Sequence, residues 1–173
     1  MTSPGHPKVY WVDAPDVGRL AVVSRPEAAL GLEQQMLALR EAGIDTLVSL
    51  LTPHEAHRVG LGNEAGAAAD AGLAFHALPT GDFGVPSSFA VVGEVAERIS
   101  EALSSGRGVG AHCFAGRGRS PLFIATVLVH NGYAPAVAID AVSQARGRRI
   151  PETTAQQRWI SDYADWRRNG RTS

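Results

Sequence analysis

The sequence predicts an α/β fold of one domain, in which a mostly parallel central sheet is flanked by helices. Short apolar runs bounded by glycine or proline alternate with longer segments of helical periodicity, as in chains that form βαβ units. The 173 residues, 45% of them hydrophobic, suffice to bury one core without disulfides or metals. With no repeat and no break in composition, we expect residues 1–173 to form a single domain with its core at about 9–166.

Five apolar segments are the expected strands. The first two flank a turn-prone stretch and should open the chain as a hairpin-like pair. The third is nearly continuous in apolar residues, which is typical of a strand covered by helices on both faces. The five segments are 9–12, 20–23, 46–51, 74–78 and 108–112.

Six segments carry helical periodicity or helix-start and helix-stop signals. The first places Leu30, Met36, Leu37 and Leu39 among polar residues and stops at a glycine. The second is rich in alanine, although three glycines weaken it by about 1 kcal/mol each. Ser87 is the expected cap of the third. The expected helices are 26–42, 54–71, 88–105, 121–130, 135–146 and 153–168.

Charge and apolar runs limit the partners of the protein. The net charge is −1, but arginines crowd the C-terminal end, and we interpret that end as a solvated helix face. These arginines are Arg146, Arg148, Arg149, Arg158, Arg167, Arg168 and Arg171. The first ten residues lack the apolar core of a signal peptide, and the longest apolar run, 121–129, is too short to span a bilayer. We expect a cytoplasmic protein without a membrane span and without a nucleic-acid partner.

Cys113 is the only cysteine, which excludes an internal disulfide and a zinc site built from several thiolates. Such a lone thiol is either packed in the core or reactive. It follows an expected strand, and a helix begins soon after it. The intervening loop, Phe114, Ala115, Gly116, Arg117 and Gly118, is rich in glycine and ends at Arg119 and Ser120.

This strand–loop–helix arrangement is suited to binding a tetrahedral anion. Backbone N–H groups from Phe114 to Arg119 can point inward at the positive end of the helix dipole, and Gly116 and Gly118 permit the backbone angles required. The same field stabilises a thiolate on Cys113. The planar fork of Arg119 matches two phosphoryl oxygens.

Two flanking side chains complete the expected loop chemistry. Ser120 can donate its hydroxyl to the sulfur, which helps Cys113 leave when a thiophosphate is hydrolysed. His112 is expected to order the loop through hydrogen bonds rather than to act as a base. The combined pattern favours a nucleophilic Cys113 over a cysteine that only fills the core.

The segment HCFAGRGRS, residues 112–120, resembles the phosphate-binding signature HCx5R-S/T of the cysteine-based protein tyrosine phosphatases. The run GDFGVP, residues 81–86, resembles the acid loop of that family, which implies that Asp82 is the general acid. The run IPETTAQ, residues 150–156, resembles the family's glutamine loop, which implies that Gln156 positions the hydrolytic water. No role is assigned to Glu152.

The compact chain resembles the dual-specificity branch, including the cyclin-dependent kinase-associated and related bacterial phosphatases. That resemblance implies hydrolysis of phosphotyrosine, and also of phosphoserine and phosphothreonine, in proteins. It implies two steps through a phosphocysteine, with neither metal nor cofactor. Cys113 attacks phosphorus while Asp82 protonates the leaving oxygen, and Asp82 then acts as base toward water, helped by Gln156.

Other functions stay open. Arg117 occupies one of two loop positions that are basic in phosphoinositide phosphatases, and Phe114 occupies the other. Hydrolysis of an RNA triphosphate, which some relatives carry out, is a further alternative, although no basic strip interleaved with aromatic residues supports this activity. A non-catalytic phosphoresidue-binding module would have the same fold. Sulfur transfer is disfavoured because its loops are shorter, and arsenate reduction because a second cysteine is missing.

Overall fold

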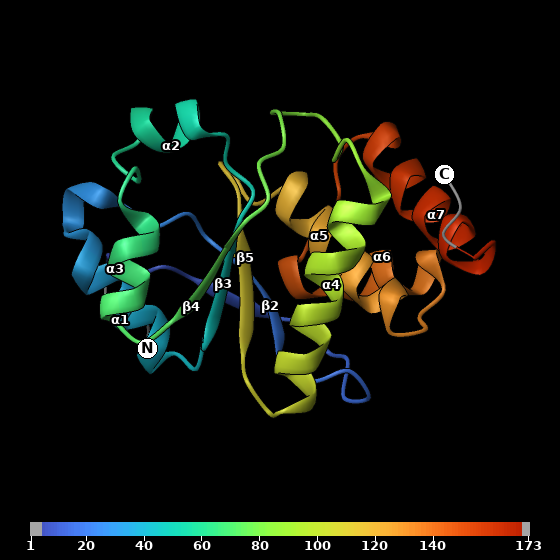
Figure 1. The fold of residues 1–173 in the computed structure, drawn as a ribbon, viewed down its shortest axis with the longest axis horizontal. Coiled ribbons are helices and arrows are strands. Elements are labelled where there is room, and N and C mark those ends of the chain that lie inside the picture. The colour runs from blue at the N-terminus through green and yellow to red at the C-terminus, as the bar shows by residue number, and fades with distance from the viewer. Residues whose placement is uncertain (1–4, 171–173) are drawn as a thin grey trace.

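The computed structural model describes residues 5–170, so Arg171 lies outside the described residues. These residues form a five-stranded sheet that lies between layers of helices (Figure 1). Its order is β1-β2-β5-β3-β4, with β1 antiparallel to β2 and all other neighbours parallel. The strands are β1 (Val9–Trp11), β2 (Leu20–Val23), β3 (Thr46–Ser49), β4 (Ala74–Ala77) and β5 (Val109–His112). The predicted α/β class is confirmed.

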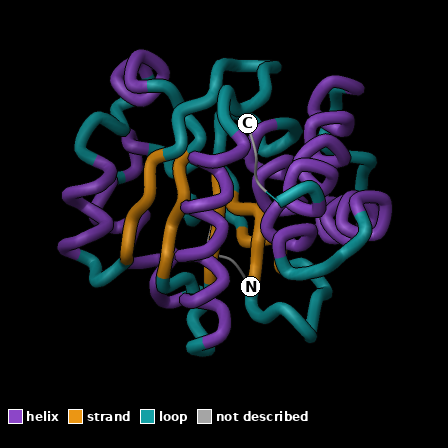
Figure 2. Tube along the Cα trace, turned by 45° about the vertical axis from the view of Figure 1, so that its right-hand side comes forward, coloured by secondary structure: helices purple, strands orange, loops and turns teal. Residues whose placement is uncertain are grey.

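Helices lie on both sides of the sheet (Figure 2). The helices α1 (Leu32–Glu41) and α3 (Glu64–Asp70) cover one face, and α4 (Phe89–Ser104) and α5 (Arg119–His130) cover the other. On the outer side of α5 pack α6 (Pro135–Arg146) and α7 (Thr154–Arg168). The short helix α2 (Pro53–Arg58) lies at the end of the sheet to which the parallel strands point.

Two apolar clusters hold these layers together. Met36, Leu39 and Leu47 belong to the cluster on the α1 and α3 side. Ile99 and Phe123 belong to the larger cluster on the other side. Every residue of α5 is buried, since the sheet, α4, α6 and α7 surround it. Each fully buried large apolar side chain contributes about 1.5–3 kcal/mol to the free energy of folding relative to an exposed one. Burial of the apolar side chains of α5 therefore holds this helix, and the loop before it, firmly in place.

Two predicted helices are interrupted by glycine. The segment 26–42 forms only a 3-10 turn at Ala28–Leu30 before α1, because Gly31 adopts a positive φ of 91° between them. Of the four apolar residues of this segment, Met36 and Leu39 are buried, whereas Leu30 and Leu37 are exposed. The segment 54–71 divides into α2 and α3 at Gly60, whose φ is 75°.

Two helix starts also differ from the prediction. Ser88, not Ser87, caps α4, because its hydroxyl accepts a hydrogen bond from the N–H of Val91. The helix α5 begins at Arg119 rather than at Pro121. That shift matters for function, since it places Arg119 and Ser120 in the first helical turn, where their side chains are held by the helix.

The basic C-terminal end is not a single solvated face. Arg146 stacks on the ring of Tyr10, with its guanidinium carbon 4.0 Å from the ring centroid. Arg167 donates a hydrogen bond to the backbone oxygen of His130 at 3.2 Å. Only part of the predicted face therefore points freely to solvent. Among residues 5–170, no helix is both long and apolar enough to cross a membrane.

Candidate active site

Cys113 lies directly after β5, at the edge of the sheet where the parallel strands end, and its side chain is buried. Two donors reach its sulfur. The backbone N–H of Gly116 lies 3.3 Å from Sγ, and the hydroxyl of Ser120 lies 3.2 Å from it. Gly116 reaches this position with a φ of 66°, which glycine adopts at little cost. The predicted hydrogen bond from Ser120 is present, and both donors favour a negatively charged sulfur.

Hydrogen bonds from the guanidinium group of Arg119 to Glu55 and Thr80 hold it in one orientation. Its Nη1 and Nη2 atoms lie 2.7 and 3.0 Å from the two carboxylate oxygens of Glu55. Nη1 also donates to the backbone oxygen of Thr80 at 2.7 Å. Burial by itself would lower the pKa of Arg119, but the hydrogen bond to Glu55 and the negative charges of Cys113, Glu55 and Asp82 raise it above its ordinary value. The guanidinium is therefore a permanent, oriented cation beside the sulfur.

Glu55 is the site residue that our sequence analysis missed. It is the third residue of α2 and forms a capping box with Thr52, whose backbone N–H it accepts at 2.9 Å. The hydrogen bond from Arg119 holds the pKa of Glu55 at about 2, with further lowering by Thr52. The sequence signal was the run Thr52-Pro53-His54-Glu55, which has the form of a capping box and marks a helix start. Nothing local in that run points to Arg119, 64 residues away.

The Glu55 carboxylate makes folding stability depend on pH. Because its folded pKa of about 2 lies below the ordinary value of 4.5, its contribution is complete above about pH 5 and is lost as the pH falls toward 2. We expect Glu55→Gln to lower the free energy of unfolding by about 2–4 kcal/mol at pH 7 and by much less near pH 3. Urea unfolding at both pH values measures this. Glu101→Gln, at an exposed position of α4, is the matched control, and an equal loss at both pH values would contradict the assignment.

Asp82 lies at the mouth of the site. Its carboxylate oxygen Oδ1 is 3.2 Å from Nη2 of Arg119, and its side chain is 55% exposed. The same oxygen accepts a hydrogen bond from the N–H of Phe83. Phe83 has a φ of 55°, which is uncommon for a bulky residue and indicates strain next to Asp82. The carboxylate thus faces both the arginine and solvent.

The loop that carries Asp82 is anchored to α7. The side-chain amide of Gln156 donates to the backbone oxygen of Gly84 at 3.2 Å, and the indole N–H of Trp159 donates to that of Pro86 at 3.0 Å. Gln156 is buried, although it lies in the first turn of a helix at the surface. Gln156, at the end of the glutamine loop, and Trp159, one turn further along α7, therefore hold the acid loop in place.

Gln156 also explains one glycine of the loop 114–118 that follows Cys113. A Cβ atom at Gly118 would lie 2.7 Å from the Gln156 amide nitrogen, which is closer than real contacts allow. Of the two loop glycines, Gly116 has a positive φ, whereas Gly118 combines a φ of −126° with a ψ of −78°, outside the regular helix and strand regions. Both therefore have the unusual backbone angles that were predicted, and Gly118 also leaves room for the Gln156 amide.

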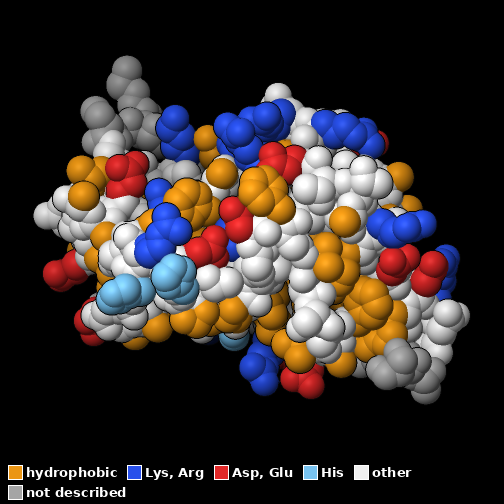
Figure 3. Space-filling model, turned by 90° about the horizontal axis from the view of Figure 1, so that it is seen from above, with side chains coloured by type: hydrophobic (Ala, Val, Ile, Leu, Met, Phe, Trp, Pro, Cys, Tyr) orange, Lys and Arg blue, Asp and Glu red, His pale blue; other side chains and the backbone are white. Residues whose placement is uncertain are grey.

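Most predicted site residues meet in one pocket. Its walls are Asp82, Phe83, Cys113, Ala115, Arg117, Gly118, Arg119, Glu152 and Gln156. Ser120 lies behind the sulfur and is buried, and Phe114 lines a neighbouring pocket instead. Glu152 was assigned no role, yet it lines the pocket and its N–H donates to the backbone oxygen of Arg117. From above, lysine and arginine side chains surround a few acidic ones on this side of the molecule (Figure 3).

His112 is buried under the loop beside a second carboxylate that our sequence analysis missed. Its Nε2 lies 2.6 Å from Oε1 of Glu64, in the first turn of α3, and its Nδ1 lies 3.3 Å from the backbone oxygen of Cys113. This arrangement suits an ordering function for His112. Within residues 5–170, no cluster of three or more His, Cys, Asp or Glu side chains could hold a metal ion.

Sequence comparison shows which known proteins this chain is similar to. Residues 21–133 match the family described as "Polymorphic toxin system, DSP-PTPase phosphatase". Cyclin-dependent kinase inhibitor 3 of Homo sapiens is 27% identical over 73% of this chain, and that of Rattus norvegicus is 26% identical. The match spans 60% of the length of these two relatives. A probable protein tyrosine phosphatase type IVA A of Dictyostelium discoideum is 32% identical over 53% of the chain and 55% of its own length.

Solved structures share the fold at lower identity. Kinase-associated phosphatase, with its catalytic-site cysteine replaced by serine, superposes with a TM-score of 0.83 at 22% identity, over 95% of this chain and 97% of its own. The active form of Tk-PTP has a TM-score of 0.75 at 23% identity, over 94% and 97%. PTPMT1 in complex with PI(5)P has a TM-score of 0.73 at 18% identity, over 89% and 95%.

Proposed function

Because the chain belongs to the dual-specificity branch of the cysteine-based protein tyrosine phosphatases, we propose that it hydrolyses phosphate monoesters through a phosphocysteine on Cys113. The observation that carries this proposal is the sulfur of Cys113, which receives two hydrogen bonds in a pocket that also contains Arg119, Asp82 and Gln156. A cysteine that only filled the core would need neither the donors nor the pocket.

In the first step, the Cys113 thiolate attacks phosphorus, and the bond from phosphorus to the leaving oxygen breaks. Asp82 gives its proton to that oxygen. The Arg119 fork binds two phosphoryl oxygens, and Glu55 keeps the fork in orientation. Inward backbone N–H groups from Phe114 to Arg119, including those of Ala115, Arg117 and Gly118, are proposed to bind the same oxygens.

In the second step, water attacks phosphorus, and the bond from sulfur to phosphorus breaks. The Asp82 carboxylate accepts the proton of the water, which the Gln156 amide positions. Ser120 donates its hydrogen bond to the departing thiolate. The amide of Gln156 is 3.2 Å from the backbone oxygen of Gly84, which supports a place for it beside the acid loop.

The test is hydrolysis of para-nitrophenyl phosphate by the pure chain in EDTA, together with acid quenching of the reaction to trap a phosphorylated enzyme. We expect metal-independent turnover and a phosphate-labelled protein whose bond has the stability of a thiophosphate. Folded protein with no turnover would support the phosphoresidue-binding alternative instead. Turnover that EDTA abolishes would overturn the phosphocysteine route.

Asp82→Asn is expected to slow the reaction by about 10²-fold, because the amide cannot donate a proton to the leaving oxygen. The defect should grow with the basicity of the leaving group. Phenyl phosphate is therefore expected to lose more activity than para-nitrophenyl phosphate when both are compared by kcat/KM. An equal loss for both substrates would indicate that Asp82 only orients Arg119.

For the substrate class, we propose a phosphorylated protein, with phosphotyrosine as the first target and phosphoserine and phosphothreonine as further ones. Phe83 is 66% exposed at the pocket mouth and offers an apolar surface to an aromatic side chain. A phosphoinositide is the second candidate, since Arg117 lines the pocket and PTPMT1, a protein of the same fold, was solved with PI(5)P. Comparing a phosphotyrosyl peptide with phosphoinositide vesicles separates the two.

We further propose that residues from about 9 to 166 act as one catalytic domain, because both apolar clusters pack on the same sheet. A cytoplasmic location is proposed as well. The mechanism requires Cys113 to remain a free thiol, as it is here, and reducing compartments preserve that state.

A further inference from the structure

Glu64 and His112 form a buried pair of ionisable side chains that the proposed mechanism does not use. Glu64 is the first residue of α3 and is 3% exposed, and His112, the last residue of β5, is fully buried. Oε1 of Glu64 lies 2.6 Å from Nε2 of His112, although the two residues are 48 positions apart in the chain. Burying either side chain without a partner would cost free energy, so each depends on the other.

The second ring nitrogen of His112 faces the carbonyl of the residue that follows it. Nδ1 lies 3.3 Å from the backbone oxygen of Cys113, so both ring nitrogens face oxygen atoms. A carbonyl oxygen can only accept a hydrogen bond, which means that Nδ1 carries a hydrogen and donates it to Cys113. One further proton is shared between Nε2 and the Glu64 carboxylate. The Glu64 side chain thereby holds the ring in the orientation in which Nδ1 reaches Cys113.

The hydrogen bond from Nδ1 determines how the peptide between Cys113 and Phe114 is turned. That peptide is planar and trans, so its N–H points away from its carbonyl oxygen. Turning the oxygen of Cys113 toward His112 therefore directs the N–H of Phe114 to the opposite side. This N–H is the first of those that the proposed mechanism assigns to the phosphoryl oxygens, and its direction depends on the His112 ring.

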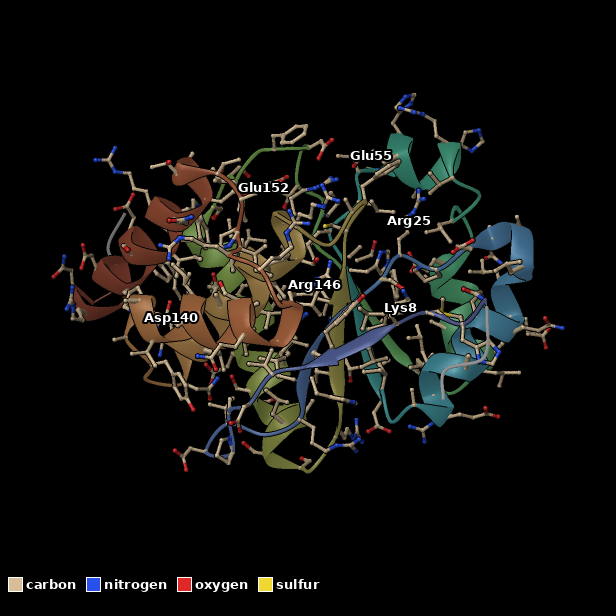
Figure 4. All side chains as sticks on the ribbon, turned by 180° about the vertical axis from the view of Figure 1, so that it is seen from behind. Lys8, Arg25, Glu55, Asp140, Arg146 and Glu152 are labelled. Atoms are coloured by element: carbon tan, nitrogen blue, oxygen red, sulfur yellow. The ribbon has the colours of Figure 1, made fainter. Side chains whose placement is uncertain are left out.

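Glu64 is the stronger of the two contacts that hold the ring. The 3.3 Å bond to Cys113 is long for an N–H donor, whereas the 2.6 Å contact with Glu64 is short. Among residues 5–170, no other carboxylate forms an ion pair with His112. Glu55, which lies at the same end of the sheet (Figure 4), binds Arg119 instead. A buried pair of this kind is often no more stabilising than apolar residues of similar size, so stability alone does not account for it.

Resting on the proposed function, we propose that Glu64 is a positioning residue of the phosphatase reaction. It holds the His112 ring, the ring holds the Cys113 carbonyl, and the carbonyl sets the direction of the first N–H of the phosphate-binding loop. Glu64 acts only through His112, since its one described side-chain contact is to that ring and it does not line the catalytic pocket. The reach of its side chain, and not its charge, is therefore what the reaction requires.

Two variants separate reach from charge. Glu64→Gln keeps the length of the side chain, and its amide can donate to Nε2 while Nδ1 keeps its hydrogen. Glu64→Asp keeps the charge but is one methylene shorter, so its carboxylate no longer reaches Nε2.

We expect Glu64→Gln to keep kcat/KM for para-nitrophenyl phosphate within about threefold and Glu64→Asp to lose about tenfold, the size of one hydrogen bond to a charged group. Equal activity of the two variants, or a larger loss in Glu64→Gln, would overturn the proposal. Glu33→Asp is the matched control, because Glu33 lies in the first turn of α1 on the same face of the sheet but is exposed. It should leave kcat/KM unchanged.

A binding measurement separates the failure of this proposal from the failure of the proposed function. Inorganic phosphate is titrated calorimetrically into the wild type and both Glu64 variants, so no turnover is required. A Kd about tenfold weaker in Glu64→Asp alone supports the positioning of the loop even if the wild type hydrolyses nothing. An unchanged Kd in Glu64→Asp overturns it even if para-nitrophenyl phosphate is hydrolysed. A merely structural defect would lower the number of binding sites per chain and leave Kd as in the wild type, which counts against the proposal. Wild-type protein that binds no phosphate overturns both proposals.

Discussion

Cys113→Ser is expected to lower kcat for para-nitrophenyl phosphate by at least about 10⁴-fold, because the reaction is proposed to pass through a bond between this sulfur and phosphorus. A serine hydroxyl is a far weaker nucleophile at neutral pH than a thiolate. The change is nearly isosteric, and the donors on Gly116 and Ser120 can still reach the oxygen. Steady-state kinetics in EDTA, with the phosphoenzyme assayed in parallel, measures the effect.

The control for Cys113→Ser is a test of whether the variant remains folded. Because the side chain is buried and replaced by one of similar size, the urea midpoint is expected to change little, and phosphopeptide binding should persist. Loss of binding together with loss of stability would point to a structural function for Cys113. Turnover within tenfold of the wild type would refute the nucleophile assignment.

Arg119→Lys is the second change with a very large expected effect, a loss of about 10³-fold in kcat/KM. Lysine keeps the charge but loses the planar fork, and so loses both the paired contact to phosphate and the paired contact to Glu55. Part of the loss is expected in kcat, because the charge on the phosphoryl oxygens is spread most widely in the transition state. Kinetics with para-nitrophenyl phosphate, separated into kcat and KM, measures it.

Glu55 offers an internal check on this interpretation. If Glu55 acts only by orienting Arg119, then adding Glu55→Gln to Arg119→Lys should cost little further activity, although Glu55→Gln alone is harmful. Additive losses would mean that Glu55 influences the reaction independently of the arginine. Arg107→Lys, an exposed replacement of the same chemical kind, should leave the kinetics unchanged.

Local sequence patterns predicted the elements well wherever the pattern was strong. The run 108–112 forms β5 from Val109, and 135–146 forms α6 with the predicted bounds. The predictions were wrong where a glycine could either be accommodated in a helix or end it, as at Gly31 and Gly60. Each glycine costs only about 1 kcal/mol in a helix, so contacts elsewhere in the fold decide the outcome.

By itself, the sequence predicted the α/β class, the order of the three loops and, through a family resemblance, Cys113, Arg119 and Asp82 as candidate site residues. The signature around Cys113 and Arg119 depends on residue types at short spacing, which the chain carries whatever its tertiary structure. Only the tertiary structure decided that Glu55 orients Arg119, that Glu64 contacts His112 and that Arg25 and Arg146 share a pocket. These groups lie far apart in the chain, and they meet because parallel strands bring their carboxyl ends to one edge of the sheet.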